Sequence, residues 1–285
     1  VVLRKVDGAG ILRRIDQHGV TLMCGAPAVL AAVLDAAADW DGPIPGSGTT
    51  RFVVAGAPPP TRTIERVETE LGWQLNQIYG LTETSPLLTI NRPRAEWDEL
   101  SPAERAVKLS RAGSPSLGTK VRIDDQGEIL ARSNTIMQGY WEQPDATADA
   151  IDQGWFHTGD GGTLDDEGYV TIADRKKDVI ISGGENVSSI EVEDALFSHP
   201  AVAEVAVIGV PDERWGETVK ALVVFAEGQM ATEAELIEHC RGRLAHYKCP
   251  TSVEVRDELA RTATGKLQKF KLRSPYWEGR DRPIG

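Results

Sequence analysis

The sequence predicts an α/β domain with a parallel sheet and a small antiparallel β subdomain, followed by a small α+β domain at the C-terminus. The first ninety residues alternate between helix-like and strand-like segments. Short strands separated by turns come next, and the last hundred residues begin a new pattern of helix, two strands and helix. The polar stretch ADRKKD separates the two patterns, so we expect domains at residues 1–175 and 176–285, with the antiparallel subdomain at about 113–174.

The order of the first elements predicts parallel strands joined by right-handed crossovers. Ligands of such sheets bind at the carboxyl ends of strands. Two loops follow predicted strands in this way, Gly56-Ala57-Pro58 and Gly80-Leu81-Thr82-Glu83. The predicted helices are residues 11–18, 26–40 and 61–72. The predicted strands are residues 20–25, which we expect to be buried, residues 49–60, which end in a Gly/Pro loop, and residues 73–80.

The rest of the chain completes the antiparallel subdomain and the small domain. Residues 92–112 are highly charged and partly helical, so we expect a surface insertion there. Residues 188–200 predict a helix, because a serine at the start and a glutamate soon after are typical of a helix N-terminus. The predicted strands are within 120–133 and at 168–175, 201–210 and 218–227, and the last predicted helix is 232–247.

The composition indicates an ordinary globular protein, with 41% hydrophobic and 26% charged residues. The formal charge of −12 disfavours nonspecific binding to nucleic acid and to anionic membranes. No apolar run approaches membrane-spanning length, so no transmembrane segment is expected. The three cysteines form no Cys-x-x-Cys pair, and the spacing of His239, Cys240, His246 and Cys249 fits no standard metal site. We therefore expect a reducing, cytoplasmic compartment; the sequence does not decide the oligomeric state.

The motif GWFHTGD at residues 154–160 ends in a glycine and an aspartate. Both residue types suit tight turns, so a β-turn would explain the stretch. Alternatively, Asp160 points at a ligand and Gly159 lets that ligand approach the backbone. These residues alone leave both interpretations open.

The motif YGLTETSP at residues 79–86 follows a predicted strand. Tyr79 can offer a ring face, and Gly80 can let a planar ligand come close. Thr82 can donate to a phosphate oxygen, and Glu83 can hold a hard cation such as Mg²⁺. A strand-to-loop turn with a capping threonine explains the same residues without a ligand.

Three further motifs lie in the C-terminal part of the chain. SGGENVSS at 182–189 is a glycine loop that enters a predicted helix, where backbone N–H groups could bind an anion, although a flexible loop with a capping serine fits equally well. RTATGKLQK at 261–269 places Lys266 after a turn of small residues, and ADRKKDVI is rich in charge. Charged residues of this kind usually form a solvated surface.

Taken together, the motifs are more specific than any one of them. GAPPP, YGLTET, GWFHTGD, ADRKKDVIISGGEN and TATGKLQK occur in this order, and the set closely resembles the adenylate-forming superfamily. That superfamily contains acyl-CoA synthetases, peptide-synthetase adenylation domains and luciferases. The resemblance covers nearly the whole chain and corresponds to the later part of a full-length member. The first predicted domain would thus be the remainder of a large AMP-binding domain.

The resemblance implies a role for each matching residue of the first domain. Gly56, Ala57 and Pro58 would pack along adenine. Tyr79 and Gly80 would complete the adenine site, with Thr82 at the phosphates and Glu83 as the magnesium ligand. A carboxylate can accept hydrogen bonds from two adjacent hydroxyls, and the resemblance makes Asp160 the residue that holds the ribose.

In the C-terminal part the resemblance implies a mobile domain. Arg175 would contact the nucleotide, and Lys177 would be the hinge about which the small domain rotates. Lys266 would stabilise the negative charge that develops as a carboxylate attacks the α-phosphate of ATP. After rotation, Ser182, Gly183 and Gly184 would line the approach of the thiol.

The amino-acid sequence of several segments, such as GYWEQPDATADAIDQGWFHTGD, resembles that of fatty acyl-CoA ligases. The resemblance therefore implies an acid–thiol ligase that uses a carboxylic (fatty) acid, ATP and coenzyme A, with Mg²⁺, and releases AMP and pyrophosphate. Aryl acids, a carrier-protein acceptor and a non-catalytic nucleotide-binding fragment remain alternatives. The superfamily's upstream phosphate loop has no match, so we expect that the chain begins inside the large domain and is inactive by itself.

Overall fold

The computed structural model describes residues 1–262 and 265–279. The chain divides into two compact units, Val1–Ile172 and Ala173–Gly285, whereas the sequence placed the division after residue 175. Each unit combines helices with β-sheet, so the predicted α/β class with a smaller α+β part is confirmed.

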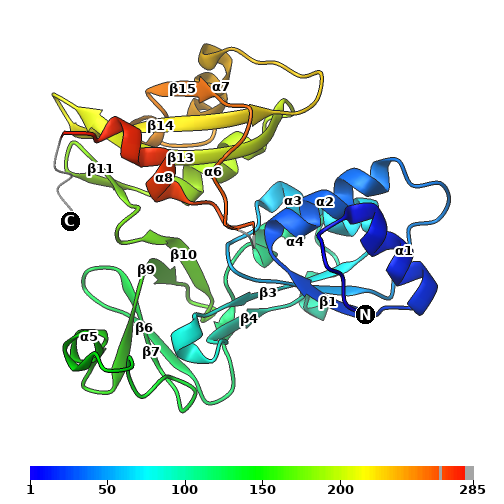
Figure 1. Cartoon of the computed structure of the whole chain (residues 1–285), viewed down its shortest axis with the longest axis horizontal. Coiled ribbons are helices and arrows are strands. Elements are labelled where there is room, and N and C mark those ends of the chain that lie inside the picture. Colours follow the sequence, from blue (N-terminus) through cyan, green and yellow to red (C-terminus); the bar gives the residue numbers. More distant parts are fainter. Residues whose placement is uncertain (263–264, 280–285) are drawn as a thin grey trace. The chain divides into compact units, whose positions relative to one another are not determined.

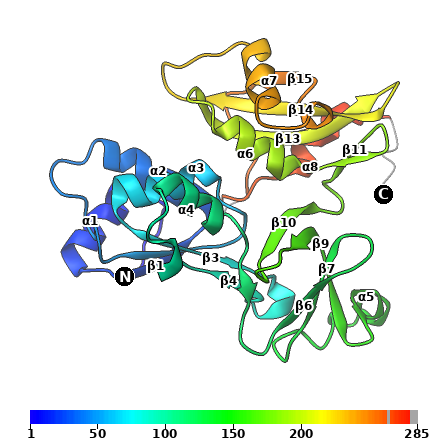
Figure 2. The same cartoon turned by 180° about the vertical axis from the view of Figure 1, so that it is seen from behind.

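The first sheet of the first unit has five strands in the order β1-β2-β3-β4-β5. Its first three strands pair in parallel, as predicted, and the last two add antiparallel pairs. Figures 1 and 2 show α2 and α3 on the same side of these strands. The strands are β1 (Leu22–Gly25), β2 (Arg51–Val54), β3 (Gln74–Tyr79), β4 (Thr89–Asn91) and β5 (Ser114–Pro115). The helices are α1 (Gly8–His18), α2 (Pro27–Ala38) and α3 (Thr61–Arg66), the last continued by a π-helix at Val67–Leu71.

The core of this unit lies between the helices and the middle of the sheet. Phe52 is fully buried and packs in one cluster with Leu12 of α1, Leu30 of α2 and Ile64 of α3. The prediction of a buried strand at 20–25 is wrong, because β1 is the first strand of the sheet and Leu22 is 57% exposed. An edge strand is covered less than a central one, which leaves alternate side chains in solvent.

The charged segment 92–112 is not only a surface insertion. It forms a 3₁₀ helix at Ala95–Trp97 and helix α4 at Pro102–Leu109. Ser101 and Glu104 form a capping box at the start of α4. Trp97, Ala106 and Leu109 are buried in the same cluster as Phe52, so the apolar face of this helix belongs to the core.

The second sheet of this unit is antiparallel, as predicted, in the order β10-β9-β7-β6, with β8 paired to β9. Residues 158–160 lie inside its longest strand, so the β-turn interpretation of GWFHTGD is wrong. The strands are β6 (Lys120–Ile123), β7 (Glu128–Arg132), β8 (Ile151–Asp152), β9 (Trp155–Leu164) and β10 (Val170–Arg175), and helix α5 is Pro144–Ala150.

The second unit is built on the long antiparallel pair β13 and β14, with β11 and β15 beside β14. Side chains of β13 alternate between two clusters: Val205 and Val207 pack in one, and Ala206 and Ile208 in the other. The strands are β11 (Ile180–Ser182), β12 (Glu185–Val187), β13 (Val202–Asp212), β14 (Gly216–Phe225) and β15 (Ser252–Val255). The helices are α6 (Ser189–Phe197), α7 (Glu233–Arg241) and α8 (Lys269–Arg273), with 3₁₀ helices at His246–Lys248 and Ser274–Tyr276.

The helix predicted at 232–247 is shorter than expected. It ends at Arg241, because Gly242 has low helical propensity and the chain turns there. The amides of Arg243 and Leu244 both donate to the carbonyl of Cys240, and Leu244 packs against the core of this unit.

The three cysteines differ in exposure, which gives a direct test of this fold. Cys24 is exposed, while Cys240 and Cys249 are buried. Burial raises the pKa of the Cys240 thiol to about 12 and raises that of Cys249 as well. Because the thiolate is the reactive form, iodoacetamide at about pH 8 should modify only Cys24 in the native protein. Peptide mass spectrometry checks this, with the denatured chain, in which all three react, as control; native modification of Cys240 would contradict the fold.

Candidate functional site

The carboxyl ends of β2 and β3 bring two of the predicted motifs to one edge of the first sheet. Val54 pairs with Gln77 in parallel, so the loop that begins at Ala55 and the turn that begins at Gly80 leave the sheet at the same edge. Gly56 and Ala57 are exposed there, and Pro58 is half-buried. Gly56 has a φ of 90°, a left-handed value that glycine adopts without strain.

Tyr79, the last residue of β3, contacts Asp160 directly. Its hydroxyl donates to Asp160 Oδ2 at 2.9 Å, and the two residues are only 8% and 7% exposed. The structure thus brings together two residues that lie 81 positions apart in the sequence. Both residues belong to motifs predicted as ligand sites, but neither motif carries a signal for this bond.

A bulge in β9 gives Asp160 its direction. Leu130 pairs with His157, but the next pair joins Glu128 to Gly161, so β9 has three residues opposite the single residue Ile129. Gly159 in this bulge has a φ of 72°, and a Cβ there would meet nothing within 4 Å. The glycine is therefore required by the backbone conformation.

Hydrogen bonds on both sides of Gly159 hold the bulge. The Thr158 hydroxyl donates to the carbonyl of Ile129 at 2.7 Å and accepts from the amide of Asp160 at 3.2 Å. The amide of Gly159 donates to Glu128 Oε1 at 2.8 Å. These contacts of Thr158 and Glu128 were not predicted from the sequence, because ordinary strand residues give no signal of them.

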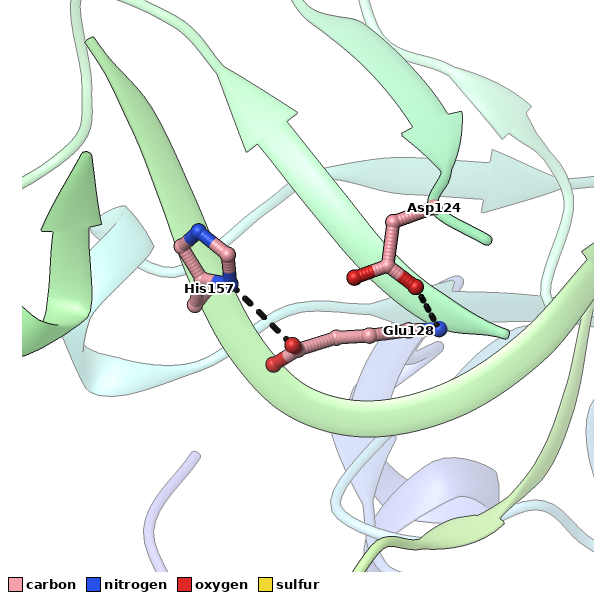
Figure 3. Close-up of side chains that lie close together, drawn as sticks. All are labelled: Asp124, Glu128 and His157. Carbon is pink, nitrogen blue, oxygen red and sulfur yellow. Dashed lines mark hydrogen bonds and ion pairs between the residues drawn. The ribbon is translucent and has the colours of Figure 1, made fainter. Parts of the chain in front are cut away.

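Figure 3 shows Asp124, Glu128 and His157 pointing toward one another. One potential ligand atom from each lies within 4.8 Å of the others, which is compatible with a metal site. However, Glu128 Oε1 accepts from Gly159, and Glu128 Oε2 accepts from His157 Nδ1 at 3.1 Å. Because both carboxylate oxygens already have protein donors, we interpret the group as a hydrogen-bond network around the bulge.

The turn after Tyr79 is a 3₁₀ helix at Thr82–Thr84. Thr84 is buried and its hydroxyl accepts from the amide of Leu81, so Thr84 is the residue that stabilises the turn. Thr82 is exposed and Glu83 is half-buried. The hydroxyl of Tyr140 donates to Glu83 Oε1 at 3.1 Å, and burial together with this bond raises the pKa of Tyr140.

Glycine is required at position 80 for a structural reason that was not predicted from the sequence. A Cβ at this position would lie 1.6 Å from the carbonyl oxygen of Pro86. The chain therefore needs glycine for the close approach of its own backbone. Room for a planar ligand was the sequence-based expectation, and it remains a proposal.

In the second unit, the glycine motif leads into a helix as predicted, with a capping serine, but its two glycines lie in a hairpin before the helix. Ser182 pairs with Glu185, and Gly183 and Gly184, with φ values of 61° and 88°, form the tight turn of the hairpin β11–β12. Helix α6 starts only after β12, and Ser188 caps it by accepting from the amide of Glu191. A Cβ on Gly183 would lie 2.7 Å from the ring of Trp215, so that indole covers one side of the turn.

Arg175 and Lys177 lie at the beginning of the second unit. Arg175 ends β10, and its carbonyl accepts from the amides of Asp178 and Val179 at 2.8 and 3.0 Å. Lys177 lies inside the resulting turn, and its carbonyl lies 3.4 Å from a guanidinium nitrogen of Arg273. Arg273 also pairs with Asp178 at 3.1 Å, which fixes α8 to this turn.

Lys266 is exposed on a short turn before α8. Its carbonyl accepts from the amide of Thr262 at 2.8 Å, and its amide donates to the Thr262 hydroxyl at 3.1 Å. Ala263 and Thr264, which belong to the predicted motif, lie outside the described residues.

A second lysine of the same segment, Lys269, was missed by the sequence analysis, which treated lysines near the C-terminus as solvated. Its side chain is only 13% exposed and its Nζ lies 2.8 Å from Glu193 Oε1. Lys269 also donates to the hydroxyl of Ser189, whose amide donates to Asp174 at 2.8 Å. Burial alone would lower the pKa of Lys269, but Glu193 and Asp174 outweigh burial and raise it.

Comparison with known proteins identifies the family of this chain. Residues 1–141 match the AMP-binding enzyme family, and residues 191–266 match the AMP-binding enzyme C-terminal domain. The chain belongs to the AMP-binding enzyme family. The predicted membership of the adenylate-forming superfamily is thereby confirmed.

Curated relatives of this chain are named as CoA ligases or acyl-activating enzymes. The 2-methylpropanoate–CoA ligase CCL4 of Humulus lupulus is 43% identical over 290 residues, which cover 96% of this chain and 51% of the relative. The probable acyl-activating enzyme 5, peroxisomal, of Arabidopsis thaliana is also 43% identical, over 96% of this chain and 51% of its own length. The chain thus spans about half the length of the curated relatives it matches.

Among solved structures, an anthranilate CoA ligase is similar to this chain. The crystal structure of that enzyme, AuaEII, in complex with anthranoyl-AMP has a TM-score of 0.82 at 30% identity. The match covers 95% of this chain and 52% of that chain. The likeness therefore extends over both units of the present structure and over about half of the neighbour.

The bond between Tyr79 and Asp160 can be tested by removing one hydroxyl. Tyr79→Phe should lower the free energy of unfolding by about 1–3 kcal/mol, because it leaves a buried carboxylate without one of its donors. Tyr140→Phe is the matched control, since Tyr140 also donates to a carboxylate but is 37% exposed, and it should cost about 0–1 kcal/mol. Urea unfolding followed by circular dichroism measures both, and equal losses would contradict the importance of the buried bond.

Proposed function

We propose that this chain belongs to an AMP-forming acid–CoA ligase. In the first half-reaction, a carboxylate attacks the α-phosphate of ATP and gives an acyl-adenylate and pyrophosphate. In the second, the thiol of coenzyme A attacks the adenylate and gives the thioester and AMP. The observation that carries the proposal is the buried Tyr79–Asp160 pair beside the Gly56 loop, in a chain whose relatives are named as CoA ligases.

The first unit binds the nucleotide in this proposal. Gly56, Ala57 and Pro58 lie along adenine, next to the ring of Tyr79. Asp160 accepts hydrogen bonds from the ribose hydroxyls, since a carboxylate has several lone-pair sites and can serve Tyr79 and a ribose together. The hydroxyl of Tyr79 keeps the carboxylate oriented, so that little reorganisation accompanies binding.

The turn at Thr82–Glu83 faces the phosphates in this proposal. The exposed Thr82 hydroxyl donates to a phosphate oxygen. Glu83 fits a Mg²⁺ ion, because it offers a half-buried carboxylate whose position is fixed by the Tyr140 hydroxyl, and oxygen ligands suit this cation. When bound, the ion would neutralise part of the charge on the phosphates.

The second unit supplies a group to each half-reaction. The Lys266 ammonium stabilises the negative charge that builds on the phosphate oxygens during adenylation, an effect typically worth roughly 2.7–4 kcal/mol of barrier. Ser182, Gly183 and Gly184 line the approach of the thiol. We further propose that Arg175 contacts the nucleotide and that the turn at Lys177 is the hinge of a mobile domain formed by residues 176–285.

The relatives support a short aliphatic acid as the substrate within the predicted fatty acid class. One relative at 43% identity is named for 2-methylpropanoate, and this is the observation that favours the aliphatic acid. The anthranilate ligase at 30% identity makes an aromatic acid the second candidate. Among the described residues, no helix is long and apolar enough to cross a membrane. We retain the cytoplasm as the proposed location, although one relative's name includes "peroxisomal".

Nucleotide binding tests the first part of the proposal on the chain as it is. AMP titrated into the chain should bind, and Asp160→Ala should weaken binding by about tenfold or more, because a charged hydrogen bond to ribose is lost. Asp166→Ala, an exposed aspartate in the turn after β9, is the matched control and should leave binding unchanged. Isothermal titration calorimetry gives the dissociation constants, and absence of AMP binding to the unaltered chain would refute the proposed site.

The two half-reactions can be separated at Lys266. The test uses a protein that contains this chain and carries out both half-reactions. In that protein, Lys266→Ala should slow acid-dependent ATP–pyrophosphate exchange by about 100-fold or more. Thioester formation from supplied acyl-adenylate should change little, because pyrophosphate, whose release Lys266 assists in this proposal, has already left. Lys271→Ala, an exposed lysine of α8, is the control. Equal loss of both half-reactions would contradict the assigned role, and a panel of aliphatic and aromatic acids in the exchange assay identifies the substrate class.

A further inference from the structure

Gly159 is not paired with any residue of β7 in the register of the two strands. In the bulge, three residues of β9 stand opposite Ile129, so β7 cannot pair with all of them. The Gly159 amide donates instead to the side chain of Glu128, at 2.8 Å from Oε1. A side chain of the neighbouring strand thus replaces the missing backbone acceptor. This bond fixes the Thr158–Gly159 peptide, and the next peptide, which leads into Asp160, is held by the bond from the Asp160 amide to the Thr158 hydroxyl.

Glu128 is itself held from several directions. It is 4% exposed, and its amide donates to Asp124 Oδ1 at 2.8 Å. The same oxygen of Asp124 accepts from the amide of Gln126 at 2.9 Å, so Asp124 shapes the turn that precedes β7. His157 Nδ1 donates to the second oxygen of Glu128 (Figure 3). A buried carboxylate with two donors can keep a single orientation, because rotation would break both bonds.

The geometry points to Glu128 as a positioning residue of the nucleotide site, one that aims the Asp160 carboxylate by holding the Gly159 peptide in the bulge. This inference rests on the proposed function only where it assigns Asp160 to the ribose. The chain of contacts runs from the Asp124 turn through Glu128 and the Gly159 amide to Asp160 and Tyr79. Glu128 itself contacts no substrate. Its effect is specific for the ribose, since the adenine loop at Gly56 belongs to a different sheet.

Two nucleotides that differ only in the ribose hydroxyls test this inference. The unaltered chain should bind AMP about tenfold or more tightly than 2′,3′-dideoxy-AMP, because only AMP can donate to Asp160. Glu128→Ala should reduce this preference to about twofold or less by weakening AMP binding alone. Glu128→Gln should keep most of the preference, because its amide oxygen can still accept from Gly159. Glu99→Ala, an exposed glutamate, is the matched control. Calorimetry and thermal unfolding are recorded for every variant.

The outcomes separate this inference from the proposed function. Absence of AMP binding by the unaltered chain would remove the proposed function. A ribose preference that persists in folded Glu128→Ala would overturn the positioning role while leaving the proposed function intact. An equal loss of affinity for both nucleotides in Glu128→Ala would also overturn it, because a general structural defect weakens binding whether or not the ribose hydroxyls are present.

Amide exchange keeps the inference testable if Glu128→Ala does not fold or if no nucleotide binds. Gly159 is exposed, so its amide should be protected from hydrogen exchange only by the bond to Glu128. NMR should show slow exchange of this amide in the unaltered chain and faster exchange, by about tenfold or more, when Glu128→Gln replaces the charged acceptor by a neutral one. Rapid exchange in the unaltered chain would overturn the inference.

Discussion

The first unit depends on one buried hydrogen bond, from the hydroxyl of Tyr79 to the carboxylate of Asp160. It joins the end of β3, in the parallel part of one sheet, to the bulge of β9 in the other. A buried carboxylate is tolerated only with donors, so the two sheets must keep this relation for the unit to remain stable. The same requirement places the carboxylate that we propose for ribose binding beside the edge where the Gly56 loop and the Glu83 turn leave the sheet.

Buried charges recur in both units, and each has partners from distant segments. In the first unit, Glu128 receives bonds from Gly159 and His157. In the second, Lys269 lies against Glu193 and fixes the segment that carries Lys266 to α6. Such groups contribute little net stability once their desolvation is counted, but removing one partner is costly. They therefore specify where the chain lies, and in both units the specified segment carries a proposed functional residue.

The glycines of the motifs show why residue type and structural role need to be separated. Gly56 and Gly159 are required for left-handed backbone, and Gly183 and Gly184 for a tight hairpin turn. Gly80 is required because the backbone at Pro86 comes too close for any side chain. All of these were selected from the sequence as candidate ligand contacts. The structure gives each a backbone reason, and these reasons are compatible with the proposed contacts, because backbone without a Cβ can also approach a ligand.

The sequence by itself determined the alternation of helices and strands, the parallel and antiparallel parts, and the residues from Gly56 to Lys266 that form the motifs. These features follow from local periodicity and from short patterns, which a single sequence contains. Only the tertiary structure decided that Thr158-Gly159-Asp160 is a bulge inside a strand, that α4 packs into the core and that Lys269 is buried. Those outcomes depend on partners such as Glu128, Phe52 and Glu193, which come from other segments. Local sequence cannot encode them, because pairing register and burial are properties of the assembled sheets.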